Sequence, residues 1–288
     1  MDTDRDGTMK ALLLALVLIL PGTAIAEPLR EVGGHALKLA FEDTFDAPGI
    51  DTTGKGTGWV PWFYTFNTRT LKGNQELERY TDRADLAAHN LSPEHDPFSY
   101  AAGILTLTAT RIPPAMAARV PLIKGAPPAQ YFSGMISSER IFAQTYGYFE
   151  ARVRLPGTPG TWPAFWLLPK SGGWPPEIDV FEVIGQEPRR VHQNVIRADK
   201  SSAHTFVDLD GTSTDWHSYG LLWTKDALVW FIDGTETKRE ANTIHEDMYM
   251  ILNLAVGGRW PGTPPPEAPF PARMEIDAVH VYALANAS

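Results

Sequence analysis

Three carboxylates lie close together in the segment EIDVFE, which begins at Glu177. The residues between them favour a β-strand. In a regular strand successive side chains point to opposite faces, so Glu177 and Asp179 would share one face and Glu182 would lie among the apolar residues on the other. Burying an unpaired carboxylate there would cost on the order of several kcal/mol. We therefore predict a β-bulge at Val180 and Phe181 that turns Glu182 towards the other two acids.

Carboxylates gathered on one face can hydrolyse a glycosidic bond. In the retaining form of this reaction one carboxylate is the nucleophile, and the other serves first as general acid and then as general base. An isolated E-x-D pattern is more often only a solvated surface, because Asp and Glu are mostly exposed. The acids alone leave both interpretations open.

A pair of tryptophans precedes the acids in the segment 160–169, which reads GTWPAFWLLP. If this segment is extended, Trp162, Ala164, Trp166 and Leu168 share a face, so two large rings stand in line. Such rings suit the flat apolar faces of sugars, and burial of both rings in the core is the alternative. Beside the acids, these rings favour a sugar-binding groove.

The first residues have the features of an export signal. The apolar stretch 11–20 follows Lys10 and is followed by Ala24-Ile25-Ala26, which has the form of a cleavage site. We expect residues 1–26 to be a signal peptide cleaved after Ala26, and the protein to be secreted or periplasmic. Three early aspartates make the start unusually acidic for a signal peptide, and translation from Met9 would remove them. The stretch is too short to anchor the protein in a bilayer.

Composition limits the partners of the chain. Residues 27–288 contain no linker, charge run or repeat, and we expect them to form one domain. The net charge of −9 argues against nucleic acid and anionic membranes as partners and fits a neutral substrate. Because the chain has no cysteine, thiol catalysis and Cys-ligated metals are excluded. We expect a monomer.

Short β-like segments separated by Gly and Pro turns recur along the chain, and no sustained helical period appears after the leader. The predicted strands are 104–109, 146–155, 177–184, 218–224, 228–232, 249–256 and 274–282. Hairpin turns are predicted at Lys225-Asp226 and Asp233-Gly234. This pattern predicts an all-β sandwich or jelly roll, with the Pro-rich segments 112–128 and 261–271 as surface loops that line a groove.

With the acids, the tryptophans and the strand pattern established, the chain closely resembles glycoside hydrolase family 16. The resemblance rests on an ordered set of blocks spread over most of the mature sequence. They are FEDTFD at 41–46, GNQELERYT at 73–81, SGMI at 133–136, YGYFEAR at 146–152, WPAFW at 162–166, the acid run, LNLAVGG at 252–258 followed by Trp260, and IDAV at 276–279.

The resemblance implies a concanavalin-like jelly-roll β-sandwich of two antiparallel sheets, with a substrate cleft on the concave sheet. It assigns Glu177 as the nucleophile, Glu182 as the general acid and base, and Asp179 as the helper between them. Glu177 must be ionised to attack, whereas Glu182 must hold a proton near neutral pH, so the two pKa values must be pushed apart. For a retaining pair we expect a carboxyl separation of about 5 to 5.5 Å.

The resemblance also implies substrate-binding residues. Trp162 and Trp166 would flank the sugar ring on the non-reducing side of the cut, Trp260 would be a further stacking platform, and Asn74 and Arg152 would donate hydrogen bonds. For Arg152 a surface ion pair is the alternative. Family members often carry a Thr-x-His pattern downstream of the acids. Here Ile196 occupies the histidine position, so His192 or Arg197 would substitute, and a purely structural histidine is the alternative.

The predicted activity is that of a secreted endo-β-glycanase that needs no cofactor for catalysis. The two residues between Asp179 and Glu182 match the bulged branch of the family, which includes laminarinases, agarases and carrageenases. The polysaccharide would be a β-glucan with β-1,3 or mixed β-1,3-1,4 linkages, or a bacterial exopolysaccharide. A non-catalytic carbohydrate-binding jelly roll and a transglycosylase are the alternatives. Asp277 matches a structural Ca²⁺ ligand of many relatives, and oxygen ligands suit this ion.

Overall fold

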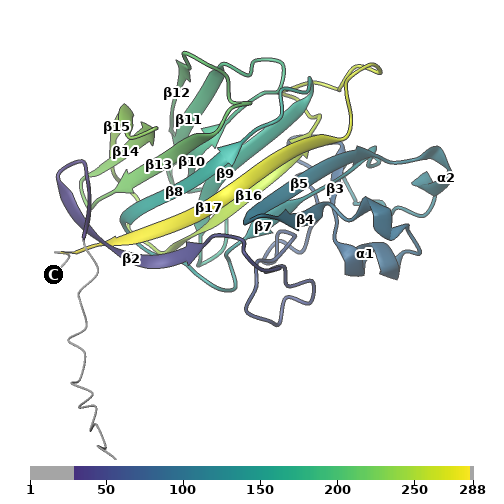
Figure 1. Cartoon of the computed structure of the whole chain (residues 1–288), viewed down its shortest axis with the longest axis horizontal. Helices are drawn as coiled ribbons and strands as arrows, with labels where there is room; N and C mark the ends of the chain where they lie inside the picture. Colours follow the sequence, from purple (N-terminus) through teal and green to yellow (C-terminus); the bar gives the residue numbers. More distant parts are fainter. Residues whose placement is uncertain (1–28, 286–288) are drawn as a thin grey trace, which may run out of the picture.

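The computed structural model of the chain describes residues 29–285, so the predicted signal peptide lies outside the described residues. These residues fold into two packed β-sheets (Figure 1). The larger sheet contains β1 (Arg30–Val32), β2 (His35–Asp43), β3 (Glu78–Tyr80), β4 (Phe98–Ala101), β5 (Ile104–Arg111), β6 (Tyr131–Ser133), β8 (Gly147–Arg154), β13 (His217–Trp223), β14 (Ala227–Ile232), β15 (Thr235–Ala241) and β17 (Ala272–Leu284).

The smaller sheet has six strands in the order β12-β11-β10-β9-β16-β7. Their bounds are β7 (Met135–Ser137), β9 (Thr161–Pro169), β10 (Glu177–Glu182), β11 (Arg190–Ile196), β12 (Ser202–Asp208) and β16 (Met248–Val256). Every strand pair in this sheet is antiparallel. Neighbouring strands therefore place residues of one cross-strand row side by side on the same face.

Helices are few. They are α1 (Arg83–Ala88), the 3₁₀ turn η1 (Pro93–His95) and α2 (Pro114–Ala117). Figure 1 places α1 and α2 at one end of the sandwich, near β3, β4 and β5. None of these described helices has the length and apolar character needed to cross a membrane.

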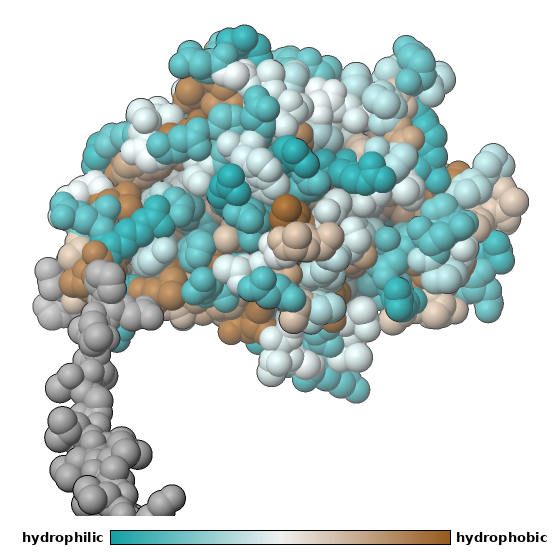
Figure 2. Space-filling model, viewed as in Figure 1, coloured by the Kyte–Doolittle hydropathy of each residue, from teal (hydrophilic) through white to brown (hydrophobic). Residues whose placement is uncertain are grey.

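The core lies between the two sheets because the strands alternate apolar and polar side chains. On β8, Phe149, Ala151 and Val153 are buried in the main core cluster, whereas Arg152 and Arg154 are exposed. Strand β16 is buried along its whole length, since one of its faces joins this core and the other lies under the segment that carries Phe63. The face shown in Figure 2 is mostly hydrophilic, with hydrophobic residues in small separate groups.

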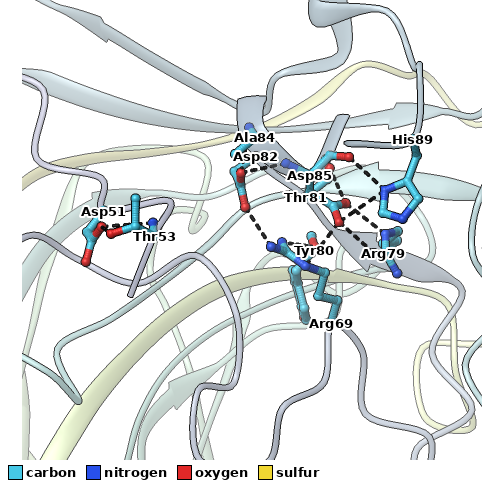
Figure 3. A network of polar contacts seen from close by, with 10 residues as sticks. All are labelled: Asp51, Thr53, Arg69, Arg79, Tyr80, Thr81, Asp82, Ala84, Asp85 and His89. Atoms are coloured by element: carbon cyan, nitrogen blue, oxygen red, sulfur yellow. Dashed lines mark hydrogen bonds and ion pairs between the residues drawn. The ribbon is translucent and has the colours of Figure 1, made fainter. Parts of the chain in front are cut away.

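An ion-pair network holds the segment that precedes α1 (Figure 3). Arg79 donates two hydrogen bonds to Asp85, with Nε–Oδ2 and Nη2–Oδ1 distances of 2.9 and 2.7 Å. Arg69 pairs with Asp82, which also accepts the first backbone N–H groups of α1. Both ends of the loop between Arg69 and Arg79 are held in this way, and residues of this loop line the cavity described below.

The predicted jelly roll is confirmed. Each predicted strand corresponds to one in the structure, namely β5, β8, β10, β13, β14, β16 and β17, and the two predicted hairpins join β13 to β14 and β14 to β15. The first Pro-rich segment contributes Ile123 and Lys124 to the cavity described below, as predicted for a groove wall. The second, 261–271, contains no helix or strand and contributes no residue to that cavity.

We predict that Phe181→Ala lowers the free energy of unfolding by about 3 to 5 kcal/mol, because it removes a large buried ring and leaves a cavity. The Phe181 ring is fully buried and lies 4.5 Å from the ring of Tyr219 on the opposite sheet. Urea unfolding measures the change. Leu122→Ala, at a side chain that is 78% exposed, is the control and should change stability by less than about 0.5 kcal/mol. Equal effects of the two substitutions would contradict this account of the core.

Candidate active site

Strand β10 contains the predicted bulge. Against β9, Asp179 pairs with Trp166 and Glu182 pairs with Ala164, so the register shifts between the two acids. Against β11, Asp179 pairs with Asn194 and Glu182 with His192, so Val180 and Phe181 together oppose the single residue Gln193. The extra residue turns Glu182 to the face of the other acids, as the sequence predicted.

The two faces of β10 carry side chains of different chemistry. Ile178, Val180 and Phe181 are fully buried in the core between the sheets. Glu177, Asp179 and Glu182 instead line one cavity of about 1020 Å³. The floor of this cavity is the face of the smaller sheet that points away from the larger one. Its walls come from the loops around residues 66–76, 123–124 and 260.

Hydrogen bonds from the larger sheet hold the bulge in place. The indole N–H of Trp230 on β14 donates to the backbone carbonyl of Asp179, with an N–O distance of 2.8 Å. Lys238 on β15 donates from Nζ to the backbone carbonyl of Gln193 at 3.2 Å, and Thr237 exchanges hydrogen bonds with the Gln193 side chain. Because a bulge disrupts the regular ladder, such partners satisfy backbone groups that would otherwise be buried without hydrogen bonds.

Each glutamate receives one indole hydrogen bond. Trp174, in the loop before β10, donates from Nε1 to Oε2 of Glu177 at 2.9 Å. Trp162 on β9 donates from Nε1 to Oε1 of Glu182 at 3.0 Å. These bonds orient the two carboxyl groups and stabilise their charged forms.

Asp179 is the most deeply buried of the three acids, with 3% of its surface exposed. Burial raises its pKa well above the ordinary value, and the charges of Glu177 and Glu182 raise it further, against an opposing hydrogen bond from Asn194. Asp179 therefore holds its proton to higher pH than an exposed aspartate does. A protonated carboxyl can donate, and the hydrogen bond with Asp179 lowers the pKa of Glu177.

Both glutamates hold their protons to higher pH than an exposed glutamate does. Burial raises the pKa of Glu177 to about 7, opposed by the hydrogen bonds from Trp174 and Asp179. Burial raises the pKa of Glu182 to about 8, and the charge of Glu177 adds to this effect, with the Trp162 bond opposing it. The Asp179 bond favours the charged form of Glu177, and a negative charge on Glu177 favours the protonated form of Glu182. This division suits a nucleophile paired with a general acid.

Most of the predicted binding residues line the cavity. Trp162, Trp166, Asn74, Trp260 and His192 all contribute to its surface. Trp260 is 39% exposed and packs edge-on against the rings of Trp162 and His192. Trp166 is 8% exposed, and its indole N–H donates to Oδ1 of Asn253 at 2.7 Å. Asn74 donates from Nδ2 to Oε1 of Glu76 at 2.8 Å.

The structure does not support the predicted role of Arg152 in substrate binding. It lies on β8 of the larger sheet and does not contribute to the cavity. Its Nη1 atom is 2.7 Å from Oδ2 of Asp277, and its guanidinium stacks on Trp216. The surface ion pair considered as the alternative is therefore the correct interpretation, with Asp277 as the partner.

The surroundings of Asp277 do not fit a Ca²⁺ site. Its carboxylate already pairs with Arg152, and the guanidinium of Arg154 stacks on the same Trp216 ring, so positive charge surrounds the position. Within residues 29–285 no group of three or more His, Asp or Glu side chains is arranged to hold a metal ion. A calcium ion needs several oxygen ligands, and the one carboxylate that the sequence assigned to it is already paired with a guanidinium.

Sequence reasoning missed several residues of the cavity. Trp174 is the most important, because it contacts Glu177 directly, and its only sequence signal is its place three residues before that acid. Asn194 and His204 enter through the pairing of β11 with β12, where Asn194 lies opposite His204. Glu76 lines the cavity beside Asn74, and burial raises its pKa.

We predict that Glu182→Gln stabilises the fold at alkaline pH. The pKa of Glu182 rises from an ordinary value of 4.5 to about 8 on folding, so the folded state holds its proton to higher pH than the unfolded state. The stability that this carboxyl contributes is complete below about pH 4.5 and is lost as pH rises through 8. The variant should therefore match the wild type near pH 4.5 and unfold at higher urea concentration near pH 9.

Glu267 is exposed, so Glu267→Gln is the matched control. Its stability relative to the wild type should not depend on pH. A stability difference between Glu182→Gln and the wild type that stays constant from pH 4.5 to 9 would show that Glu182 is not buried in this way.

Comparison with known proteins agrees with this geometry. Residues 87–279 match the family described as Glycosyl hydrolases family 16. The chain is 36% identical over 255 residues to the endo-1,3-1,4-beta-glycanase EglC of Rhizobium meliloti (strain 1021). The match covers 86% of this chain and 52% of that protein, so the chain spans about half the length of this relative. It is 32% identical over 302 residues to a beta-glucanase of Rhodothermus marinus. This match covers 93% of this chain and 92% of that protein.

Among solved structures, the endo-beta-1,3-glucanase of Pyrococcus furiosus superposes with a TM-score of 0.70 at 27% identity, covering 88% of this chain and 97% of that one. The laminarinase of Rhodothermus marinus superposes with a TM-score of 0.66 at 30% identity, and the superposition covers 85% of this chain and 97% of that one. The shared blocks, the two-sheet sandwich and these relatives lead to one conclusion: the chain belongs to glycosyl hydrolases family 16.

Proposed function

We propose that this chain is a secreted endo-β-glycanase that hydrolyses a β-glucan with β-1,3 or mixed β-1,3-1,4 linkages by a retaining double displacement. The observation that carries the proposal is the bulge in β10, which brings Glu177, Asp179 and Glu182 together on the floor of one cavity. The relatives named as an endo-1,3-1,4-beta-glycanase and a beta-glucanase support the substrate class. The signal-like segment at residues 1–26 supports secretion.

In the first step, the carboxylate of Glu177 attacks the anomeric carbon of the bound sugar. A bond forms between a Glu177 oxygen and this carbon while the bond to the leaving oxygen breaks, and Glu182 gives its proton to that oxygen. Asp179 donates a hydrogen bond to Glu177 and so favours its charged form before the attack. Trp174 holds the other end of the same carboxylate.

In the second step, Glu182 is a carboxylate and acts as the general base. It takes a proton from water while the water oxygen attacks the anomeric carbon, and Glu177 leaves as a carboxylate. Two inversions at one carbon give net retention. Once Glu177 is esterified its charge is gone, so the pKa of Glu182 falls at the moment when Glu182 must ionise.

A sugar-binding protein without catalysis is the competing function, and the charges of the site argue against it. Burying three carboxyls beside one another costs folding energy, because each of their pKa values is raised by burial. Binding a neutral glycan does not require this cost, whereas glycoside hydrolysis does.

We predict opposite stereochemical outcomes when each glutamate is removed and azide is supplied. With Glu177→Gly, azide attacks the anomeric carbon directly and gives the α-glycosyl azide. With Glu182→Gly and a 4-nitrophenyl β-glycoside, the covalent intermediate still forms, and azide then gives the β-glycosyl azide. Without azide, polysaccharide cleavage should fall roughly 10³-fold or more in both variants. NMR of the products distinguishes the two anomers.

Glu267→Gln is again the control and should retain full activity. Full laminarin or lichenan cleavage by Glu177→Gly would refute the proposed function, and so would the β-azide as its product.

We predict that the two indole donors control opposite limbs of the pH profile. Activity should fall at low pH as Glu177 gains a proton and at high pH as Glu182 loses one. Trp174→Phe removes a bond that lowers the pKa of Glu177, so the acid limb of kcat/KM should move to higher pH. Trp162→Phe removes a bond that lowers the pKa of Glu182, so the alkaline limb should move to higher pH.

Trp216→Phe, at the residue just before β13 of the larger sheet, is the control and should leave both limbs in place. If Trp174→Phe moved only the alkaline limb, the assignment of Glu177 and Glu182 would have to be exchanged.

A further inference from the structure

Two lysines stand in the wall of the cavity. Lys72 belongs to the loop before β3, and Lys124 belongs to the Pro-rich segment 112–128. Both side chains are exposed. They are the only Lys or Arg residues among the described residues that line this cavity. The mechanism derived above uses neither of them.

Backbone hydrogen bonds attach the loop of Lys72 to β16. The N–H of Leu77 donates to the carbonyl of Val256 on β16 at 2.8 Å, and the N–H of Arg259 donates to the carbonyl of Asn74 at 2.8 Å. In the smaller sheet β16 lies next to β9, on the side away from β10. The loop therefore borders the cavity on the β16 side, opposite to β11 and β12.

Contacts between the two segments bring the lysines together. Nε2 of Gln75 donates to the carbonyl of Lys72 at 2.7 Å and to the carbonyl of Gly125 at 3.4 Å. The Lys72 side chain also lies against Gly125, because a Cβ atom at that glycine would be 3.6 Å from Cδ of Lys72. Gly125 directly follows Lys124, so the two positive charges come from neighbouring segments of one wall.

No acid of the described chain neutralises these charges. Within residues 29–285 neither lysine forms an ion pair. Glu76, the acid of the same loop, is 3% exposed, and its carboxyl accepts hydrogen bonds from Asn74 and from the N–H of Leu71. The chain as a whole has a net charge of −9, so this part of the cavity wall is opposite in sign to the protein.

Two cations on neighbouring segments repel each other, and an anion between them relieves this repulsion. An ammonium group also donates hydrogen bonds, which an anionic oxygen accepts more strongly than a neutral hydroxyl does. Because both lysines line the cavity that holds the acids, a glycan chain bound across the acids can carry such an anion to them.

We propose that Lys72 and Lys124 bind a negatively charged substituent on a sugar of the polysaccharide, on the β16 side of the sugar that reacts. The inference rests on the proposed function and narrows its substrate class to a β-glucan that carries acidic groups. The lysines take no part in bond cleavage. Their contribution is preference for an acidic polymer over a neutral one with the same backbone.

Two derivatives of one glucan test this preference. Laminarin or lichenan, whichever the wild type cleaves, is substituted to the same low density with carboxymethyl groups or with neutral hydroxyethyl groups. We expect the wild-type kcat/KM to be about three- to tenfold higher on the carboxymethyl glucan at low salt, a modest factor because exposed ion pairs are weak. At about 0.5 M salt the two rates should agree within about twofold, because salt screens exposed charges.

The double variant Lys72→Gln with Lys124→Gln should lose the preference at low salt and keep its rate on the hydroxyethyl glucan within about twofold of the wild type. Lys72→Glu with Lys124→Glu should reverse the preference. The matched control is Lys55→Gln with Lys225→Gln, which removes the same charge at exposed positions outside the cavity and should keep the wild-type preference. Thermal unfolding of each variant separates a folding defect from a binding defect.

A wild type that cleaved both derivatives equally at low salt, or preferred the hydroxyethyl glucan, would overturn the inference while leaving the proposed function intact. So would a preference that survived in Lys72→Gln with Lys124→Gln, or one that the control variant lost as well. If the wild type cleaved neither the derivatives nor the unsubstituted glucans, the proposed function would fail first, and the inference with it.

Discussion

The chemistry of this protein depends on one extra residue in β10. Without it, Glu182 would point into the core, where Phe165, Phe181 and Tyr219 pack. With it, three acids share one face. A bulge is disfavoured where the ladder is regular, and here Trp230 and Lys238 of the opposite sheet bind carbonyls at and across from it. The sandwich therefore contributes to catalysis directly, because the sheet that is remote from the cavity holds the strand that lines it.

The bulge also explains the electrostatics. Burial raises the pKa of all three carboxyls, and neighbouring charges raise those of Asp179 and Glu182 further. What separates the two glutamates is the hydrogen bond from Asp179, which lowers the pKa of Glu177, and the charge of Glu177, which raises the pKa of Glu182. The large core between the sheets offsets the folding cost of this arrangement, as is usual for active sites in which activity opposes stability.

The sequence predicted the floor of the site better than its edges. The conflict between strand alternation and the third acid was enough to predict the bulge, because burying Glu182 would cost more than an irregular strand. For Arg152, the sequence predicted a strand at 146–155 but did not show to which sheet that strand belongs. Trp174 comes from a loop without periodicity, and the His192–His204 contact depends on the register of β11 against β12. Such contacts between distant segments have no local pattern in the chain.

The two sides of β10 differ in how far their polar groups are satisfied. Towards β16, a closed chain runs from the Trp166 indole to Asn253 and on to the Tyr80 hydroxyl, and every bond in it is made within the protein. Towards β12, the Nε2 atom of His192 and the Oδ1 atom of Asn194 lack partners within residues 29–285. A satisfied network holds its shape without ligand. The β16 side of the cavity is therefore held rigid before any substrate arrives.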